Sequence, residues 1–382
     1  MGSKKKRKLA CLLGIVCLLA LFGCGKEKKT DEAGGSVMLV NRCFTEEGIV
    51  QQNNSRTGKV DYFDYKTKSY RPLCGVPSCP HNSEECFAFY LRKHTDIIGR
   101  LGERWYYQKY KPDGSRVFCS SSLDGQDEKE IGEFSHGKAF GAALFFDHFL
   151  MTATVDWFIN EETGEVDENG KCGIYRYDLE SGEEELLVPE RESLWDAYCV
   201  YGCYENCLVY LEQTDEEGME YGLRIKDLGT GDVTKPLEDM LFWPVSAYAM
   251  EGSTLVCNAK EGESRKVIEL DVESGEWKEI PKEQEGGAAE IFWTKNLKLL
   301  EFREDVDGKS VRKVWQYGEN GDAVLVRETE EYPWFRPLGI ADDLLVGQYG
   351  EEQVSRDDGF ELGTIPLEDY LAGKNNFTLL KY

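Results

Sequence analysis

A short pattern of residues recurs along this chain and constrains its fold more than any other feature of the sequence. In the clearest copy, residues 175–183 (YRYDLESGE), apolar and polar residues alternate up to an Asp, and a Ser-Gly pair then precedes an acidic return run. Side chains of a strand alternate between its two faces, and glycine adopts the positive φ of tight turns, so the pattern predicts a β-hairpin. The pattern recurs from residues 60, 117, 223 and 267, and more weakly from residue 314.

Each hairpin closes a longer unit that begins with an apolar strand, a second strand and a polar loop. After a first unit that ends near Leu73, further units begin near residues 97, 139, 195, 243, 290 and 335. The turn residues are separated by 60, 54, 49 and 44 positions, which is the period of four-stranded propeller blades; they are Asp64, Asp124, Asp178, Asp227 and Asp271. We therefore predict an all-β fold, a β-propeller of about seven (six to eight) four-stranded blades. The alternative is a set of unrelated hairpins in a sandwich or an irregular β-fold.

A ring of blades must join its two ends, because an open ring leaves long unpaired edge strands. We expect the ring to be closed by pairing of N- and C-terminal strands, with SVMLVN or GIVQQ paired with the last blade. Helical periodicity is poor throughout the chain, and LEDYLAGK near the C-terminus is the best helical candidate. This scarcity argues against a two-domain α/β solute-binding protein.

The first residues have the features of a targeting segment. The basic run GSKKKRK precedes LACLLGIVCLLALF, which is short for a spanning helix, and the apolar run ends in Leu21-Phe22-Gly23-Cys24. This end resembles a bacterial lipobox, although Phe22 departs from the small or aliphatic residues usual there. We predict a signal peptide at 1–23, lipidation of Cys24 (diacylglyceryl and palmitate), a flexible tether at 24–36 and a propeller at 37–382. The propeller is then lipid-anchored on the outer face of the bacterial cytoplasmic membrane; an uncleaved N-terminal anchor is the alternative.

The charge of the chain restricts its partners. Its 382 residues carry a formal net charge of −26, and a basic cluster lies at residues 4–8, inside the predicted signal peptide. Phosphate binding requires a basic surface, so a nucleic-acid partner is not expected. The same acidity argues against adhesion to anionic lipid by charge alone, so we expect membrane contact through the lipid anchor.

A Cys- and His-rich insert at residues 74–86 follows the first hairpin. Its spacing is Cys74-x4-Cys79-x-His81-x4-Cys86, and three thiolates with one imidazole make a complete tetrahedral set for structural zinc. The spacing differs from that of standard zinc knuckles. The insert therefore predicts either a zinc site or a loop stapled by disulfides.

The disulfide alternative follows from the predicted location. Ten cysteines remain after the signal peptide and Cys24 are set aside, and an even number outside the cytoplasm favours disulfides. One cysteine of the insert would then pair elsewhere, with Cys43 or Cys119. Cys199 and Cys207 are a further candidate pair, because a hairpin turn between them could place them on opposed strand positions.

Two stretches resemble a known group of proteins. The run LCGVPSCPHNSEEC after a YFDYKTK hairpin, and the closing IPLEDYLAGKNNF, are similar to a group of Gram-positive lipoproteins of unknown function. Those lipoproteins carry a TolB-like or related β-propeller, so the resemblance implies the same fold. It implies no activity, substrate or catalytic residue.

The search for a reactive site gives little. The chain has no GxSxG, P-loop or GxGxxG motif, and His94, His136 and His148 occur singly, as packed or exposed strand residues do. Four tryptophans fall where one blade is expected to cross to the next, near the mouth of the channel and beside acidic loops: Trp195, Trp243, Trp293 and Trp334. Such rings could stack a sugar or hold a cationic ligand, or they could simply wedge neighbouring blades together.

These observations favour a non-enzymatic, cell-surface propeller that binds a ligand or partner at its channel face. The expected partners are a cell-wall glycan, a cationic peptide or a surface protein. The alternatives are an extracytoplasmic enzyme acting on glycans, which would need a carboxylate cluster at the channel mouth, and a purely structural or assembly scaffold.

Overall fold

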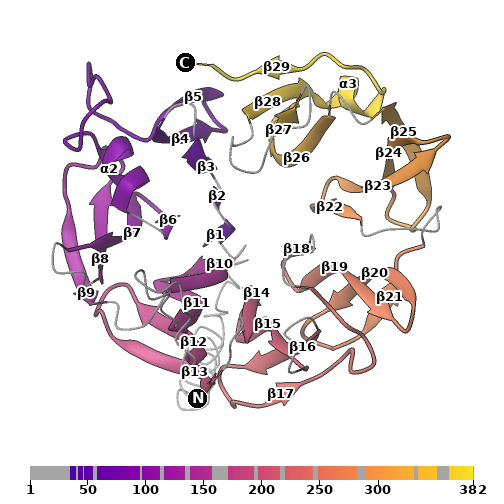
Figure 1. Ribbon diagram of the computed structural model, residues 1–382, viewed down its shortest axis with the longest axis horizontal. Coiled ribbons are helices and arrows are strands. Elements are labelled where there is room, and N and C mark those ends of the chain that lie inside the picture. Colours follow the sequence, from indigo (N-terminus) through magenta and orange to yellow (C-terminus); the bar gives the residue numbers. More distant parts are fainter. Residues whose placement is uncertain are drawn as a thin grey trace, which may run out of the picture. The chain divides into compact units, whose positions relative to one another are not determined.

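The computed structural model describes residues 35–39, 42–45, 47–54, 58–94, 97–111, 116–133, 138–156, 171–192, 197–215, 220–243, 248–281, 289–330, 334–350 and 361–381. Their strands form a seven-bladed β-propeller with four-stranded antiparallel blades, which confirms the predicted fold class (Figure 1). The predicted signal peptide, Cys24 and the tether up to residue 34 lie outside the described residues. Across the described ranges, no helix combines the length and apolarity needed to cross a membrane.

The blades follow one another in chain order, and within each blade the strands follow one another from the centre of the ring outward (Figure 1). Blade 1 contains β2 (Arg42–Thr45), β3 (Gly48–Asn54), β4 (Lys59–Asp64) and β5 (Ser69–Pro72). Blade 2 contains β6 (Ile98–Leu101), β7 (Arg104–Tyr110), β8 (Arg116–Ser122) and β9 (Lys129–Glu133). Blade 3 contains β10 (Lys138–Phe146), β11 (Phe149–Asp156), β12 (Lys171–Asp178) and β13 (Glu184–Glu192).

The second half of the ring repeats the arrangement. Blade 4 contains β14 (Tyr198–Tyr204), β15 (Cys207–Gln213), β16 (Tyr221–Asp227) and β17 (Val233–Thr234), and blade 5 contains β18 (Tyr248–Glu251), β19 (Thr254–Glu261), β20 (Ser264–Asp271) and β21 (Trp277–Glu279). Blade 6 contains β22 (Glu290–Trp293), β23 (Lys298–Val306), β24 (Lys309–Tyr317) and β25 (Ala323–Glu330). Blade 7 contains β26 (Trp334–Ala341), β27 (Leu344–Gly350), β28 (Glu361–Pro366) and β29 (Thr378–Leu379). The expected C-terminal helix is α3 (Leu367–Leu371), and α2 (Phe87–His94), between blades 1 and 2, was not expected.

One further strand, β1 (Gly35–Leu39), precedes blade 1 and includes the last two residues of the predicted tether. It pairs with β2 on one side and with β10, the inner strand of blade 3, on the other, both antiparallel. The predicted pairing of N- and C-terminal strands is therefore wrong, since the described strands of blade 7 pair only with one another. The physical reason is that blade 7 already obtains its fourth strand, β29, from the same stretch of chain as its other three.

Side chains close the ring between blades 7 and 1. Ile49 and Phe63 of blade 1 pack with Ala341 and Val346 of blade 7 in one buried cluster. Apolar packing thus joins the two blades, and none of their described strands is exchanged.

The recurring hairpin connects the third and fourth strands of a blade, as its sequence predicts. Asp178 Oδ1 accepts hydrogen bonds from the backbone N–H groups of Glu180 (2.8 Å) and Ser181 (2.9 Å), and Gly182 has a φ of 76°. An Asp therefore fixes the start of the turn and a glycine adopts the left-handed backbone that ends it. Equivalent pairs are Asp227 with Gly231 and Asp271 with Gly275.

The register of the strands gives the blades two different ends. In blade 1, Gly48 at the start of the second strand lies opposite Asp64 at the end of the third strand. Turns between first and second strands and turns between third and fourth strands therefore share one end of the blades, which we call the turn face. The opposite end, where the chain crosses between blades and where second and third strands are joined, we call the crossover face.

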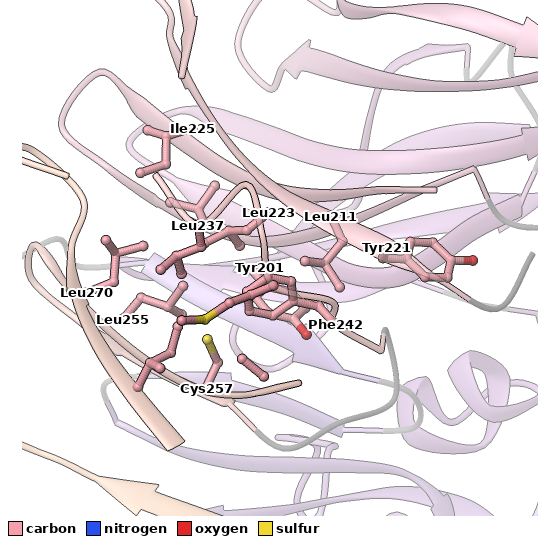
Figure 2. Close-up of a cluster of buried hydrophobic side chains, with 14 of the residues drawn as sticks. Tyr201, Leu211, Tyr221, Leu223, Ile225, Leu237, Phe242, Leu255, Cys257 and Leu270 are labelled. Carbon is pink, nitrogen blue, oxygen red and sulfur yellow. The ribbon is translucent and has the colours of Figure 1, made fainter. Parts of the chain in front are cut away.

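The core lies between adjacent blades. Figure 2 shows the cluster between blades 4 and 5, in which Leu211 and Tyr201 lie near Leu255, Cys257 and Leu270. All five side chains are at most 2% exposed. Blade-to-blade burial of this kind supplies most of the hydrophobic stabilisation of a propeller.

Candidate metal centre

The Cys- and His-rich insert begins where β5 ends and leads into helix α2. The Cys86 carbonyl accepts a hydrogen bond from the N–H of Tyr90 (2.8 Å), so Cys86 lies at the start of the helix. The first turn of α2 therefore orients Cys86, while Cys74 follows directly from the end of the outer strand of blade 1.

The structure brings the four predicted ligands together. One ligand atom each from Cys74, Cys79, His81 and Cys86 lies within 4.8 Å of all the others. His81 Nδ1 lies 3.2 Å from Cys86 Sγ. Cys74 and Cys86 are buried, at 8% and 2% exposure, whereas Cys79 and His81 are half-buried. Three sulfur atoms and an imidazole nitrogen at such separations could hold a metal ion such as zinc.

The backbone around Cys79 adopts a conformation that non-glycine residues rarely take. Ser78 has a φ of 63° and His81 a φ of 51°, both in the left-handed region. Such conformations cost roughly 1–2 kcal/mol per residue and persist where the surrounding structure imposes them. In this segment they turn the side chains of Cys79 and His81 toward Cys74 and Cys86.

The electrostatics of the two half-buried ligands suit metal binding. The backbone N–H of His81, hydrogen bonds from the neighbouring thiols and the charge of Lys59 hold the pKa of Cys79 below its usual value. Burial, and then the charge of Lys59, lower the pKa of His81, while Asp61 opposes this shift. A thiolate and a neutral imidazole are the forms that bind zinc, so both shifts favour the ligating state.

The cysteines do not form the predicted disulfides. None of the ten cysteines of the described residues is part of a disulfide. Cys199 lies opposite Leu211, and Cys207 lies opposite Tyr204, so Cys199 and Cys207 are not opposed. The reason is the position of the turn: β14 runs to Tyr204 and β15 begins at Cys207, which moves Cys207 to the very end of the hairpin.

The insert packs into the boundary between blades 1 and 2. Cys74 and Cys86 belong to one buried cluster with Val60 of blade 1 and with Trp105 and Val117 of blade 2. Helix α2 contributes three further side chains to the same cluster: Phe87, Ala88 and Leu91. A metal held by the four ligands would therefore fix a segment that bridges two blades.

Cys86 and His81 also have the residue types of a nucleophile and its base. A nucleophilic cysteine must be accessible and largely thiolate. Cys86 is 2% exposed, and burial raises the pKa of its thiol to about 11. The pair is therefore poorly suited to attack on a substrate.

His148, the one other histidine whose side chain is described, gives no catalytic arrangement. His148 Nδ1 lies 3.0 Å from Asp147, and Nε2 lies 3.7 Å from Asp178 at the start of the recurring turn. The side chain of His94 and the whole of His136 lie outside what the structure describes. His148 thus belongs to the turn chemistry of blade 3.

The predicted tryptophan ring is divided between the two faces. Trp334 begins β26, and Trp243 lies in the crossover from blade 4 to blade 5; both are half-buried at the crossover face. Trp293 is instead the last residue of β22, opposite Lys298, which places it at the turn face. The placement expected for Trp293 is wrong because β22 begins only at Glu290, three residues earlier. Trp195 lies outside the described residues.

Each described member of the set has a cation of the chain over its ring. Arg265 lies 5.7 Å from the Trp243 ring centroid, Lys298 lies 5.2 Å from Trp293 and Arg312 lies 5.2 Å from Trp334. One face of each ring is therefore already covered by a cation of the chain, so a ligand would meet the edge or the other face of the ring.

A pocket of about 260 Å³, including its open mouth, lies between blades 6 and 7. It is lined by Glu290, Ile291, Phe292, Leu299, Glu301, Arg336, Pro337 and Tyr370. Glu290 and Glu301 lie opposite each other on β22 and β23. Glu290 pairs with Arg336 at 2.8 Å, and the buried Glu301, whose pKa is raised by burial, pairs with Arg312. Each carboxylate thus has its own arginine, the pattern of a structural ion-pair cluster more than of an acid–base pair.

Comparisons with known proteins support the fold only. No family model matches the chain, and no curated protein matches it. Among solved structures, an acylaminoacyl peptidase from Pyrococcus horikoshii is 14% identical with a TM-score of 0.50, over 93% of this chain and 53% of that one. A structure from an analysis of two prolyl endopeptidases is 13% identical with a TM-score of 0.54, over 92% of this chain and 50% of that one.

TolB from Acinetobacter baumannii is 16% identical with a TM-score of 0.37, over 91% of this chain and 80% of that one, too low a score to carry an argument. The chain spans about half the length of the two peptidases that it matches. At these identities the likeness shows a shared propeller fold and says nothing of activity.

Proposed function

We propose that this chain is a non-catalytic binding propeller, anchored outside the cytoplasmic membrane by lipid on Cys24 and stabilised by a structural zinc ion. The observation that carries the zinc assignment is the convergence of Cys74, Cys79, His81 and Cys86 within 4.8 Å. The protein supplies all four ligands of a tetrahedral ion, which leaves no open coordination position for water or substrate. Closed sites of this kind are structural, whereas catalytic zinc keeps one position open.

The proposed binding surface is the crossover face. Trp243 and Trp334 lie there, half-buried, so part of each ring can meet a ligand. Exposed carboxylates join them from the loops between second and third strands, including Glu263 and Asp307. Aromatic rings beside carboxylates favour a cell-wall glycan or a peptide, and the acidity of the chain disfavours nucleic acid. A surface protein is a third kind of partner for this face.

The first experiment measures mass and metal on one preparation. The full chain is expressed in a bacterial host, extracted from membranes without added metal or reductant, and analysed by intact-mass spectrometry and elemental analysis. We expect a chain that begins at a lipid-modified Cys24 and contains a single zinc ion. An unmodified Met1 start contradicts the lipid anchor, and loss of free thiols without zinc contradicts the metal site.

The second experiment measures binding by tryptophan fluorescence. The protein is titrated with cell-wall glycan fragments and with cationic peptides, and Trp334→Phe is compared with Trp277→Phe. Trp277 is the matched control, because it is 42% exposed on β21, an outer strand. We expect a saturable signal that Trp334→Phe loses and Trp277→Phe keeps; a flat response to every ligand favours a scaffold.

A further inference from the structure

The first described strand shows from which side the chain enters the propeller. Gly35, the first residue of β1, lies opposite Phe146, and Phe146 ends β10 beside the turn to β11. Val37 lies opposite Phe44, one residue from the turn that joins β2 to β3. Both neighbours of β1 therefore place Gly35 at the turn face. Strand β1 itself lies near the centre of the ring (Figure 1).

We propose that the turn face of the propeller is held toward the outer leaflet of the membrane and that the crossover face points away from it. The inference rests on the proposed lipidation of Cys24. Ten residues, 25–34, join that cysteine to Gly35. The orientation then follows from the length of this connection and from the place where it enters the blades.

The connection is too short to pass around the propeller. Ten residues span about 35 Å when fully extended, and a flexible linker of this length averages about 17 Å from end to end. A route over the outside must cross four strands, about 19 Å, and then follow the height of a blade. Strand β10 has nine residues, which at ~3.3 Å per residue gives a height of about 30 Å. The outer route thus needs about 50 Å, more than the extended chain can reach.

The route through the centre of the ring is also unfavourable. It would need almost the whole extended length, and fixing the backbone of ten residues costs about 1–2 kcal/mol for each. Strand β1 already lies on the channel side of blade 2, between β2 and β10 (Figure 1). A second pass of chain would have to fit beside it.

Exposed acidic side chains lie at both faces, so these charges do not determine which face is held toward the membrane. The length of the tether and its entry point determine the orientation. Asp342 and Asp343 are exposed at the turn face, with side-chain exposures of 79% and 81%. Glu263 and Asp307 are exposed at the crossover face. Exposed carboxylates thus lie at both faces, and anionic lipid repels them at either one. The propeller is therefore held near the bilayer with its proposed binding surface turned outward.

Photo-cross-linking to lipid tests the orientation. The photoreactive residue p-benzoyl-phenylalanine replaces either Lys66, exposed in a turn of the turn face, or Glu263, exposed in a loop of the crossover face. The lipidated full chain is reconstituted in vesicles of phosphatidylglycerol and phosphatidylethanolamine and irradiated. We expect several-fold more lipid adducts from position 66 than from position 263. Equal yields, or a higher yield from position 263, would overturn the orientation.

Three controls test this inference and separate it from the proposed function on which it rests. Cys24→Ala should give no adduct from either position; adducts that persist in this variant indicate adhesion without the anchor and overturn the tether argument. Failure of the unsubstituted chain to float with vesicles overturns the lipid anchor itself.

Insertion of about 30 Gly/Ser residues after Gly34 should abolish the difference between the positions, because the longer linker reaches either face. A difference that survives the insertion would show that the tether is not its cause.

Discussion

The two boundaries of blade 1 are built differently. Toward blade 2, the buried cluster includes the insert and helix α2, and the four candidate metal ligands lie in or beside it. Toward blade 7, the cluster is smaller: Ile49, Phe63, Ala341 and Val346 are fully buried, and the surrounding apolar side chains are only partly buried. The first boundary can be cross-linked by a metal, while the second depends on side-chain contacts.

The two boundaries of blade 1 also differ in how the chain connects the blades on either side. The boundary with blade 2 is covalently continuous, yet the chain places there a crossover of about 25 residues that carries the candidate metal centre. The boundary with blade 7 joins segments far apart in sequence, with no strand exchanged between them. Contacts distant in sequence bear the larger loop-closure entropy, so we expect the blade 7–blade 1 boundary to open first when the metal is bound. Removal of the metal should reverse that order.

Loss of a buried metal ligand should have the largest effect. We expect Cys86→Ala to abolish zinc binding and to lower the free energy of unfolding by at least about 3 kcal/mol, because zinc contributes about 10–16 kcal/mol to the folding of small metal domains. The loss should appear in thermal unfolding, and as faster amide exchange in α2 than in the strands of blade 7.

The matched control is Cys119→Ala. Cys119 is buried at 2% exposure in the same cluster and is not one of the four converging ligands. We expect this variant to keep its zinc and to lose about 1–2 kcal/mol by the removal of a small buried side chain. Equal zinc content in both variants would refute the metal assignment. Chelation of the unsubstituted protein should reproduce the exchange pattern of Cys86→Ala.

A change at the other boundary should have a smaller effect. A Cβ on Gly339 would lie 2.0 Å from the Tyr65 hydroxyl oxygen and 2.8 Å from the ring carbon that bears it. We expect Gly339→Ala to cost about 1–3 kcal/mol by overpacking and to leave the zinc content unchanged. Denaturant unfolding and amide exchange would measure the cost and locate it in blades 7 and 1.

The companion variant is Tyr65→Phe, which removes the atom that the new methyl group would meet first. In a double-mutant cycle we expect Tyr65→Phe to recover part of the cost of Gly339→Ala. If the free-energy changes of the two single variants simply add in the double variant, residues 65 and 339 do not interact sterically across this boundary.

The blades could be predicted from the sequence because their signals are local. Asp178 and Gly182 encode a turn through their own hydrogen bonds and backbone freedom, whatever the rest of the chain does. Pairing of β1 with β10 could not be predicted in this way, since an alternating strand specifies a buried face and not a partner. Helix α2 was missed because it is only eight residues long and depends on tertiary packing for its stability.

The convergence of the four candidate metal ligands could be predicted, but the choice between a metal site and disulfides could not. The short spacing of Cys74, Cys79, His81 and Cys86 in the sequence predicts that they are neighbours. A disulfide and a zinc site differ in the positions of the sulfur atoms, and these positions depend on the folded backbone. The sequence analysis did not identify a set of buried polar residues in the second strands of the blades. A single polar residue within an otherwise apolar strand is the signal that could have found them. They are Gln108, Gln213, Asn258 and Gln348. Asn258 shows their use, because it joins blade 5 to the backbone of Ala289 by two hydrogen bonds of 2.8 Å.

The smallest effect is expected from the exposed ion pairs at the boundary of blades 7 and 1. Lys68 Nζ lies 3.0 Å from Asp343 and 3.4 Å from Asp342, and its hydrogen bond lowers the pKa of Asp343 while raising that of Lys68. The pairing stabilises the fold above the unfolded pKa of Asp, about 3.9, and below that of Lys, about 10.4. It is lost as pH falls through the folded pKa of Asp343.

Lys68→Met should therefore lower the melting temperature slightly at pH 7 and not at pH 2, and high salt should reduce the difference. Lys66→Met, exposed in the same turn, is the control; a Lys68→Met effect as large as that of Gly339→Ala would show that charge, and not packing, closes the ring.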